Sequence, residues 1–199
     1  MFAQFRRDAE AWCAGRLWQV RIPVLLYLLG VWIAHSRDAR HQSIFYGMDF
    51  GIHELGHIVF GLFHNDVLTA LGGSLLQCTA PLIAALMFYR QRDFFAISFA
   101  VAWFGTNLFE VAAYAGDAVA RSLPLVTPGG GEPIHDWNYA LATLGWLRYT
   151  ESIATLHRFG AHLAMASSLA FGGWLITRMM IAPQPSTSSP ESSESPASR

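Results

Sequence analysis

Two histidines and a glutamate form the pattern His53-Glu54-Leu55-Gly56-His57 inside a long apolar stretch of the chain. Residues four apart lie on the same face of a helix, so both imidazoles can bind one metal ion. A glutamate beside the first histidine can take a proton from a metal-activated water. Ionisable groups at bilayer depth are costly and usually functional. The motif therefore predicts metal-dependent hydrolysis at or inside a membrane, with His53 and His57 as ligands and Glu54 as general base.

The residues around the motif support a buried metal site. Asp49 lies four residues before His53, on the predicted ligand face, where its carboxylate can accept a hydrogen bond from a ligand imidazole. Gly56 leaves room for a close neighbour or for substrate. Neutral imidazoles combined with a carboxylate suit zinc best, so Zn²⁺ is the expected cofactor.

A catalytic zinc usually has three protein ligands and one open position. The chain offers four candidates for the third ligand: Asp117, Glu110, and the adjacent pair His135 and Asp136, which follows a glycine-rich loop. A carboxylate carried on a helix is the more common partner of this motif in membrane enzymes, so Asp117 is favoured, then His135, then Glu110. The pair also suits the N-cap of the next helix.

Other polar residues are expected to orient ligands or to hold substrate. Asn107 lies one turn before Glu110, and a buried hydrogen bond between helices is the simpler interpretation of both. Gln77 follows Gly72, Gly73 and Ser74, where small residues allow close helix approach; alternatively, exposed backbone and Gln77 could hold a substrate segment or an oxyanion. The predicted orienting or substrate-binding residues are Asp49, Gln77, Asn107, Glu110 and Asp136.

Composition places the chain in a membrane. Of its 199 residues 53% are hydrophobic and only 14% are charged, and the mean hydropathy is +0.31. A soluble domain has about 25% charged residues. The net charge of −1 gives no reason to expect a nucleic-acid partner. The two cysteines, Cys13 and Cys78, lie in different segments and predict neither a disulfide nor a thiolate metal site.

The apolar residues fall into blocks near the length that crosses a hydrocarbon core, about 20 residues. They predict an all-α, polytopic transmembrane helix bundle with five to six spans. A short sixth segment, 137–147, could re-enter the membrane or lie on its surface. The five other predicted spans include 23–34 with its flanks, 43–63, 68–89, 94–115 and part of 153–181.

Three regions are expected: an interfacial helix at 1–20, a transmembrane metallopeptidase-like domain at 21–182, and a disordered tail at 183–199 that is rich in Ser, Pro and Glu. A cleavable signal peptide is the alternative for the first apolar run. The predicted location is a bacterial inner membrane. Arginines near the N-terminus favour a cytoplasmic N-terminus, but with alternating spans Arg37, Arg40, Arg90 and Arg92 would lie outside, so the sequence leaves orientation open.

A transmembrane helix that carries His-Glu-x-Gly-His resembles the site-2 protease class of intramembrane zinc metalloproteases. In that class a later helix supplies an Asn and an Asp, and the Asp is the third zinc ligand. The resemblance therefore implies that Asp117 is the third ligand and that Asn107 is the accompanying Asn. It covers the second to fourth predicted spans. The chain departs from the class in having Ala118 after Asp117 and no peptide-binding domain. The chain also resembles membrane metalloproteases that use a downstream glutamate as a metal ligand. This second resemblance implies Glu110 as the third ligand.

The leading hypothesis is a membrane-embedded zinc hydrolase, specifically a peptidase acting on a membrane-protein or peptide substrate within the lipid bilayer. Two alternatives remain open. One is a zinc-dependent lipid amidase or other small-molecule hydrolase, because the motif fixes the metal chemistry and not the substrate. The other is a non-catalytic metal-binding membrane protein. The segment from Asp117 to Asp136 is a candidate lid.

Overall fold

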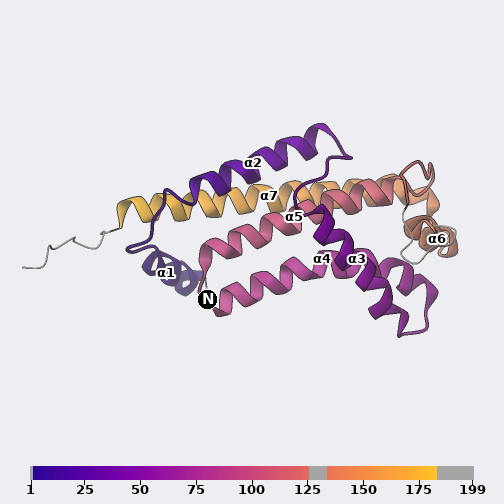
Figure 1. Ribbon diagram of the computed structural model, residues 1–199, viewed down its shortest axis with the longest axis horizontal. Helices are drawn as coiled ribbons and strands as arrows, with labels where there is room; N and C mark the ends of the chain where they lie inside the picture. Colours follow the sequence, from indigo (N-terminus) through magenta and orange to yellow (C-terminus); the bar gives the residue numbers. More distant parts are fainter. Residues whose placement is uncertain (1, 126–133, 183–199) are drawn as a thin grey trace, which may run out of the picture.

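Seven α-helices and one 3-10 helix form the part of the chain that the computed structural model describes, residues 2–125 and 134–182 (Figure 1). The all-α prediction is confirmed for these residues, and the predicted tail at 183–199 lies outside them. The helices are α1 (Phe2–Trp12), α2 (Ile22–Arg37), α3 (Tyr46–Gly61), α4 (Asp66–Arg90), α5 (Phe94–Gly116), α6 (Asp136–Thr143), η1 (Leu147–Tyr149) and α7 (Thr150–Ile181).

Side-chain caps fix where three of the helices begin. The Asn65 side chain accepts a hydrogen bond from the Leu68 N–H at 2.9 Å before α4. Asp93 caps α5 in the same way. His135 caps α6, because its Nδ1 accepts the Asn138 N–H at 3.3 Å. Satisfying the free N–H groups of the first turn sets the starting residue of each helix.

Three helical segments are long and apolar enough to cross a membrane: α4, α5, and the continuous stretch Leu147–Ile181 that contains α7. The sequence analysis expected five to six spans. The predicted span 43–63 forms the 16-residue helix α3, and the predicted span 23–34 forms α2, a shorter apolar helix also of 16 residues. At 1.5 Å per residue each is about 24 Å long, less than the roughly 30 Å of a hydrocarbon core.

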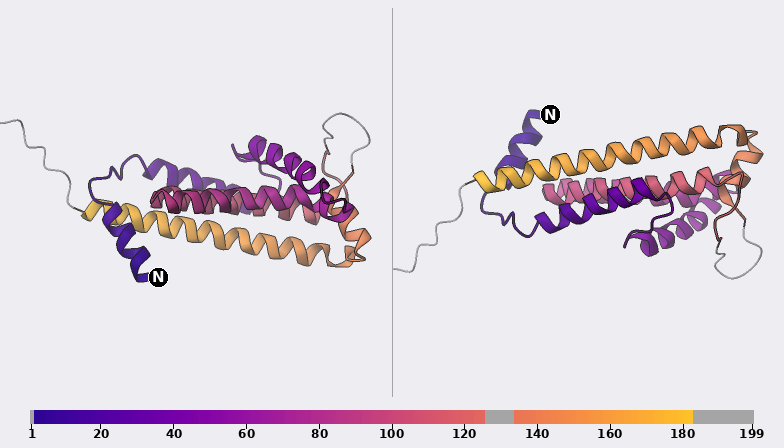
Figure 2. Two further views of the ribbon diagram at one scale, coloured as in Figure 1. Left: turned by 90° about the horizontal axis from the view of Figure 1, so that it is seen from below. Right: turned by 90° about the horizontal axis from the view of Figure 1, so that it is seen from above.

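Helices α5 and α7 lie side by side along the bundle (Figures 1 and 2). Small residues allow the approach: a Cβ at Gly105 would lie only 2.9 Å from the Met165 side chain. Two reciprocal hydrogen bonds join the helices, since Ser98 Oγ donates to the Ser168 carbonyl at 2.8 Å and Ser168 Oγ donates to the Ser98 carbonyl at 2.7 Å. Polar side chains buried between membrane helices are thereby satisfied.

The two ends of the bundle differ. Helix α1 packs at one end, where the Phe5 ring lies 5.3 Å from the ring of Phe94 in the first turn of α5 and 5.7 Å from that of Phe171 in α7. Helix α6 and η1 lie at the other end, between the end of α5 and the start of α7 (Figure 1). We call these the α1 end and the α6 end.

Candidate metal centre

The two motif histidines lie on the inward face of α3, one turn apart. Their ring centroids are 4.8 Å apart. The His53 side chain is 9% exposed and that of His57 is 22% exposed. The spacing of the motif alone predicted this shared face, and the structure agrees.

Glycines bring α3 and α4 into close contact at the motif. A Cβ on Gly56 would overlap the backbone of Gly72 and Gly73. A Cβ on Gly73 would lie 2.5 Å from His53 Nε2. The Gly72–Gly73 pair therefore acts as the small-residue interpretation predicts, by letting the backbone of α4 pass directly beside a ligand imidazole.

The carboxylate that reaches the two histidines is that of Asp136, the first residue of α6. Its Oδ2 lies 3.3 Å from Nε2 of His53 and 3.3 Å from Nε2 of His57. One ligand atom from each of the three residues lies within 4.8 Å of the others, and among the described residues this is the group of His, Cys, Asp and Glu that could hold a metal ion. The structure thus places Asp136, rather than the favoured Asp117, beside the motif.

Hydrogen bonds on the far side of each ring decide which nitrogen is available. His53 Nδ1 lies 3.0 Å from Gln77 Oε1, and His57 Nδ1 lies 2.9 Å from the Thr69 carbonyl oxygen. Both partners are acceptors, so each Nδ1 carries the hydrogen and each neutral ring presents its Nε2 lone pair. Both lone pairs face the oxygen of Asp136.

This convergence fits a bound cation. Ligands of a tetrahedral zinc, with bonds of about 2.0–2.1 Å, stand about 3.4 Å apart, close to the 3.3 Å between Asp136 Oδ2 and each Nε2. Two imidazoles and a carboxylate are a donor set that zinc favours. Burial opposes ionisation of Asp136, but when the two Nε2 atoms are protonated, their hydrogen bonds and that of Tyr114 outweigh burial and hold the pKa of this carboxyl below its usual range. A bound metal ion would take the place of these two protons. An ionised carboxylate is the form that binds metal.

Two further residues orient the ligands. The Tyr114 hydroxyl, in the last turn of α5, donates to Asp136 Oδ2 at 3.0 Å and accepts the Asp136 N–H at 3.1 Å. Gln77 Nε2 donates to Glu110 Oε2 at 2.8 Å, which turns the amide oxygen of Gln77 toward His53. Contacts of this kind hold ligands in the orientation that binding requires.

Glu110 therefore lies behind Gln77, not at the ligand atoms. The Asp49 carboxylate accepts a hydrogen bond from Trp103 Nε1 at 2.7 Å, and Asn107 Nδ2 donates to the Trp103 carbonyl at 2.9 Å. The expected contact of Asp49 with a ligand imidazole is made instead by Gln77. Asp49 of α3 is thus joined to α5 next to the site, and the Asn107 hydrogen bond lies within α5.

Asp117 and His135 pair with each other beside the site. Asp117 Oδ2 lies 3.4 Å from His135 Nε2, and the same carboxylate accepts the N–H groups of Ser122 and Leu123. Burial raises the pKa of Asp117, but these hydrogen bonds outweigh it and leave the pKa lowered. Burial lowers the pKa of His135 and outweighs Asp117, which keeps the ring neutral. His135 Nδ1 caps α6 and its Nε2 lies against Asp117, and neither residue joins the group around His53 and His57.

Glu54 is half-buried next to His53 and makes no hydrogen bond or ion pair within the described part of the chain. It lies close enough to His57 and Tyr114 for its charge to act on both. A carboxylate beside the metal group, with its oxygens uncommitted, can accept a proton from a reacting water.

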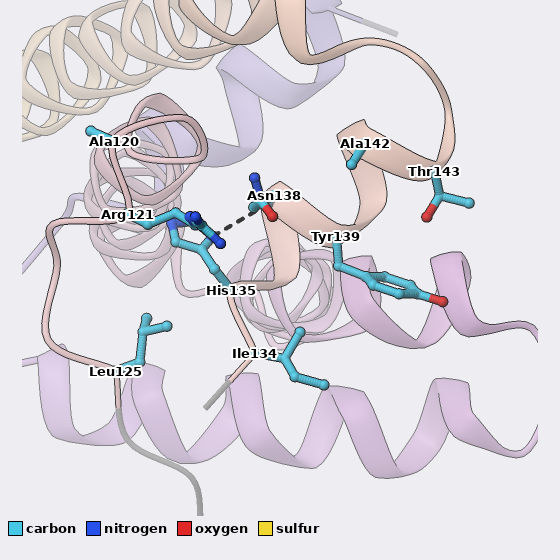
Figure 3. Close-up of a pocket in the computed structure, with 9 residues that line it drawn as sticks. All are labelled: Ala120, Arg121, Leu125, Ile134, His135, Asn138, Tyr139, Ala142 and Thr143. Carbon is cyan, nitrogen blue, oxygen red and sulfur yellow. Dashed lines mark hydrogen bonds between the residues drawn. The ribbon is translucent and has the colours of Figure 1, made fainter. Parts of the chain in front are cut away.

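A pocket of about 610 Å³ opens on the other side of His135 (Figure 3). Its lining includes Arg121, His135, Asn138 and Tyr139, and the dashed line in Figure 3 is the hydrogen bond between His135 and Asn138. None of the three residues of the metal group lines it. The pocket thus borders the site through His135 without containing the ligand atoms.

The sequence analysis missed Tyr114 and Thr69. Tyr114 carried a signal, because Asn107, Glu110 and Tyr114 recur at the three- and four-residue spacing of one helix face. Thr69 acts through its backbone carbonyl, which has no sequence signature.

Comparison with known proteins adds no relative: no family model, no curated protein and no solved structure matches the chain. The argument for function therefore rests on the geometry of the site.

Proposed function

We propose that the protein is a membrane-embedded zinc-dependent hydrolase, specifically a peptidase related in its chemistry to the site-2 protease class. The observation that supports this is the convergence of His53 Nε2, His57 Nε2 and Asp136 Oδ2, with each Nδ1 held by an acceptor. In this proposal these three residues hold Zn²⁺, which when bound activates water and polarises a carbonyl group. Glu54 lies beside this group and its carboxylate makes no hydrogen bond among the described residues, which supports a hydrolase over a metal-storage protein.

The residues of the chain then have distinct tasks. Glu54 takes a proton from the attacking water and passes it to the leaving amine. Gln77 and Thr69 hold the two imidazoles with Nε2 inward, and Tyr114 holds Asp136. Cleavage of a peptide bond by water in this way needs no covalent intermediate with the chain.

The membrane setting is part of the proposal. Beyond the three candidate spans, α2 and α3 would enter the lipid to complete a bundle of five membrane segments, with the bacterial inner membrane as its location. Large apolar side chains on and just after α3 support contact with lipid: Leu55 is 50% exposed, Ile58 69% and Leu62, which follows the helix, 75%. A substrate that arrives through the bilayer, such as a membrane-protein segment, would first meet α3 on this face.

The test compares purified wild type with Glu54→Gln, using Glu151→Gln on the exposed start of α7 as the matched control. Metal content by mass spectrometry should show stoichiometric zinc in all three proteins. Cleavage of a transmembrane peptide in detergent or nanodiscs should be lost in Glu54→Gln and kept in Glu151→Gln. The proposal would be contradicted if purified, well-folded wild type held no stoichiometric zinc, or if the Glu54→Gln variant kept full turnover.

The substrate is tested separately. Wild type and Glu54→Gln are incubated with the peptide and with a fatty-acid amide lipid. Peptide cleavage by wild type alone supports a peptidase. Release of fatty acid without peptide cleavage would instead assign the same zinc centre to a lipid amidase.

A further inference from the structure

The arginines are divided unevenly between the two ends of the bundle. Helices α2 and α5 begin, and α4 and α7 end, at the α1 end (Figure 1). Contacts confirm this placement: Arg92 Nη1 lies 3.8 Å from Asp8 of α1, and Arg178 Nη2 lies 3.3 Å from Glu10 of α1. Among the described residues, seven arginines lie there against three carboxylates, Asp8, Glu10 and Asp93; the arginines are Arg6, Arg7, Arg16, Arg21, Arg90, Arg92 and Arg178.

The α6 end has a different balance. Arg40 Nη2 donates to Ser122 Oγ at 3.1 Å, which ties the α2–α3 loop to the loop after α5. The five arginines in and near the connections at this end are Arg37, Arg40, Arg121, Arg148 and Arg158. Five carboxylates of the described residues lie in or near the same connections, namely Asp38, Asp66, Asp117, Asp136 and Glu151.

The fold removes the conflict that the sequence left open. With five alternating spans, Arg90 and Arg92 would lie opposite Arg6 and Arg7. Helix α3 does not carry the chain back to the α1 end, because it has only 16 residues and ends at the α6 end, where α4 begins (Figure 1). Helix α4 therefore makes the return to the α1 end. Arg92 therefore lies beside the N-terminal helix.

Physical chemistry favours one orientation for this distribution. Arginines near the ends of membrane helices are retained on the cytoplasmic side. Arginines at this position are also attracted to the anionic headgroups there. Helix α1 suits such a surface: Phe2 is 87% exposed, and the Arg16 guanidinium lies 4.1 Å from the Trp12 ring centroid.

The metal group lies close to the opposite face. His57 is bonded to Thr69 in the first turn of α4, and Asp136 is bonded to Tyr114 in the last turn of α5. Thr69 is three residues from the start of α4 and Tyr114 two residues from the end of α5, which is about 5 Å or less along each axis.

We propose that the α1 end lies on the cytoplasmic face against anionic lipid headgroups, and that the metal group opens toward the non-cytoplasmic face. The substrate would then present its scissile bond near that outer face. This inference rests on the membrane insertion in the proposed function, not on zinc or hydrolysis.

The test labels single cysteines at the two ends. Ala14 and Ala120 are exposed alanines in connecting segments at the α1 and α6 ends. Each is changed to cysteine in a chain that carries Cys13→Ala and Cys78→Ala, expressed in a bacterium. Intact spheroplasts are treated with a membrane-impermeant maleimide, and lysed spheroplasts give the total that can be labelled.

We expect Ala120→Cys to label in intact spheroplasts at least about tenfold more than Ala14→Cys, with both labelling after lysis. Equal labelling, or more labelling of Ala14→Cys, would overturn the proposal. If the cysteine-free chain does not accumulate, a reporter at the C-terminus of the full wild-type chain decides. A fluorescent protein fused at this terminus should fluoresce, because the proposal places the terminus in the cytoplasm, and alkaline phosphatase fused there should be inactive. The reverse pattern would overturn the orientation. Neither readout depends on metal, so failure here leaves the zinc measurements unaffected.

Discussion

The α6 end and the α1 end both concentrate charged side chains, but they use them in opposite ways. At the α6 end His53, Asp117 and His135 are buried, and Asp136, His53 and His57 point three ligand atoms at one another. At the α1 end most arginines are exposed, as Arg92 is at 72%, and their ion pairs with Asp8 and Glu10 lie near the surface. Buried, mutually oriented groups form a site, whereas exposed groups of one sign form a surface.

The contrast also appears in the packing that supports each end. The metal group depends on glycines where any side chain would force neighbouring atoms to move. Gly73 is one of them, because its Cα lies directly beside the His53 ring. The α1 end is joined by aromatic contacts, including the Phe5–Phe94 and Trp12–Phe94 ring pairs. Substitutions should therefore have large, specific effects at the α6 end and small, additive effects at the α1 end.

The largest effect is expected for Asp136→Ala. Removing one of three ligands should reduce zinc affinity by at least about a hundredfold, more than the loss of a residue that only orients a ligand. Competition with a zinc-binding dye measures the affinity. Asp117→Ala is the matched control, because Asp117 is bonded to Ser122, Leu123 and His135, and it should keep stoichiometric zinc. Zinc lost in Asp117→Ala and kept in Asp136→Ala would contradict the ligand assignment.

Gln77→Leu should weaken zinc binding about 10- to 100-fold, because His53 Nδ1 loses the acceptor that selects its tautomer. The tautomer can be read from ¹⁵N chemical shifts of the imidazole in the metal-free protein. Gln77→Glu keeps an acceptor and should restore part of the affinity if its carboxyl shares a proton with Glu110. Unchanged zinc affinity in Gln77→Leu would show that Gln77 only fills space.

Gly73→Ala should destabilise the protein by about 1–3 kcal/mol, since the new methyl group overlaps His53 and α3 must move. Gly51→Ala in α3 is the control, because a Cβ there meets nothing within 4 Å. Replacing a helical glycine with alanine at an open position should be neutral or stabilising by up to about 1 kcal/mol. Unfolding in mixed micelles followed by circular dichroism measures both. Equal stability of the two variants would be evidence against the close α3–α4 contact.

The smallest effect is expected at the α1 end. Arg92→Gln removes an exposed contact to Asp8 at 3.8 Å, and pairs of this kind contribute about 0–1 kcal/mol. Stability should fall by less than about 1 kcal/mol, and zinc affinity should not change. A loss of zinc in Arg92→Gln would mean that the two ends are coupled, and the comparison between them would fail.

The sequence by itself determined the local part of the site. The four-residue spacing of His53 and His57 fixes a shared helix face, the motif predicts a glutamate at position 54 beside it, and the apolar blocks predict helices long and apolar enough to span a membrane. Each of these depends on periodicity along a few turns of one helix, which sequence reports directly.

The tertiary structure decided the third member of the metal group. Asp117, His135 and Asp136 lie within 20 residues of one another, and spacing does not tell which one reaches α3. The cap made by His135 sets the start of α6, so that Asp136 faces the histidines while Asp117 turns toward the loop. Three helical segments of the described chain are long and apolar enough to span a membrane, against the five to six spans predicted, because α2 and α3 each have only 16 residues. Contacts between distant segments depend on where each helix begins and how closely two helices approach. Helix caps and glycine contacts determine both, and they are seen only in the tertiary structure.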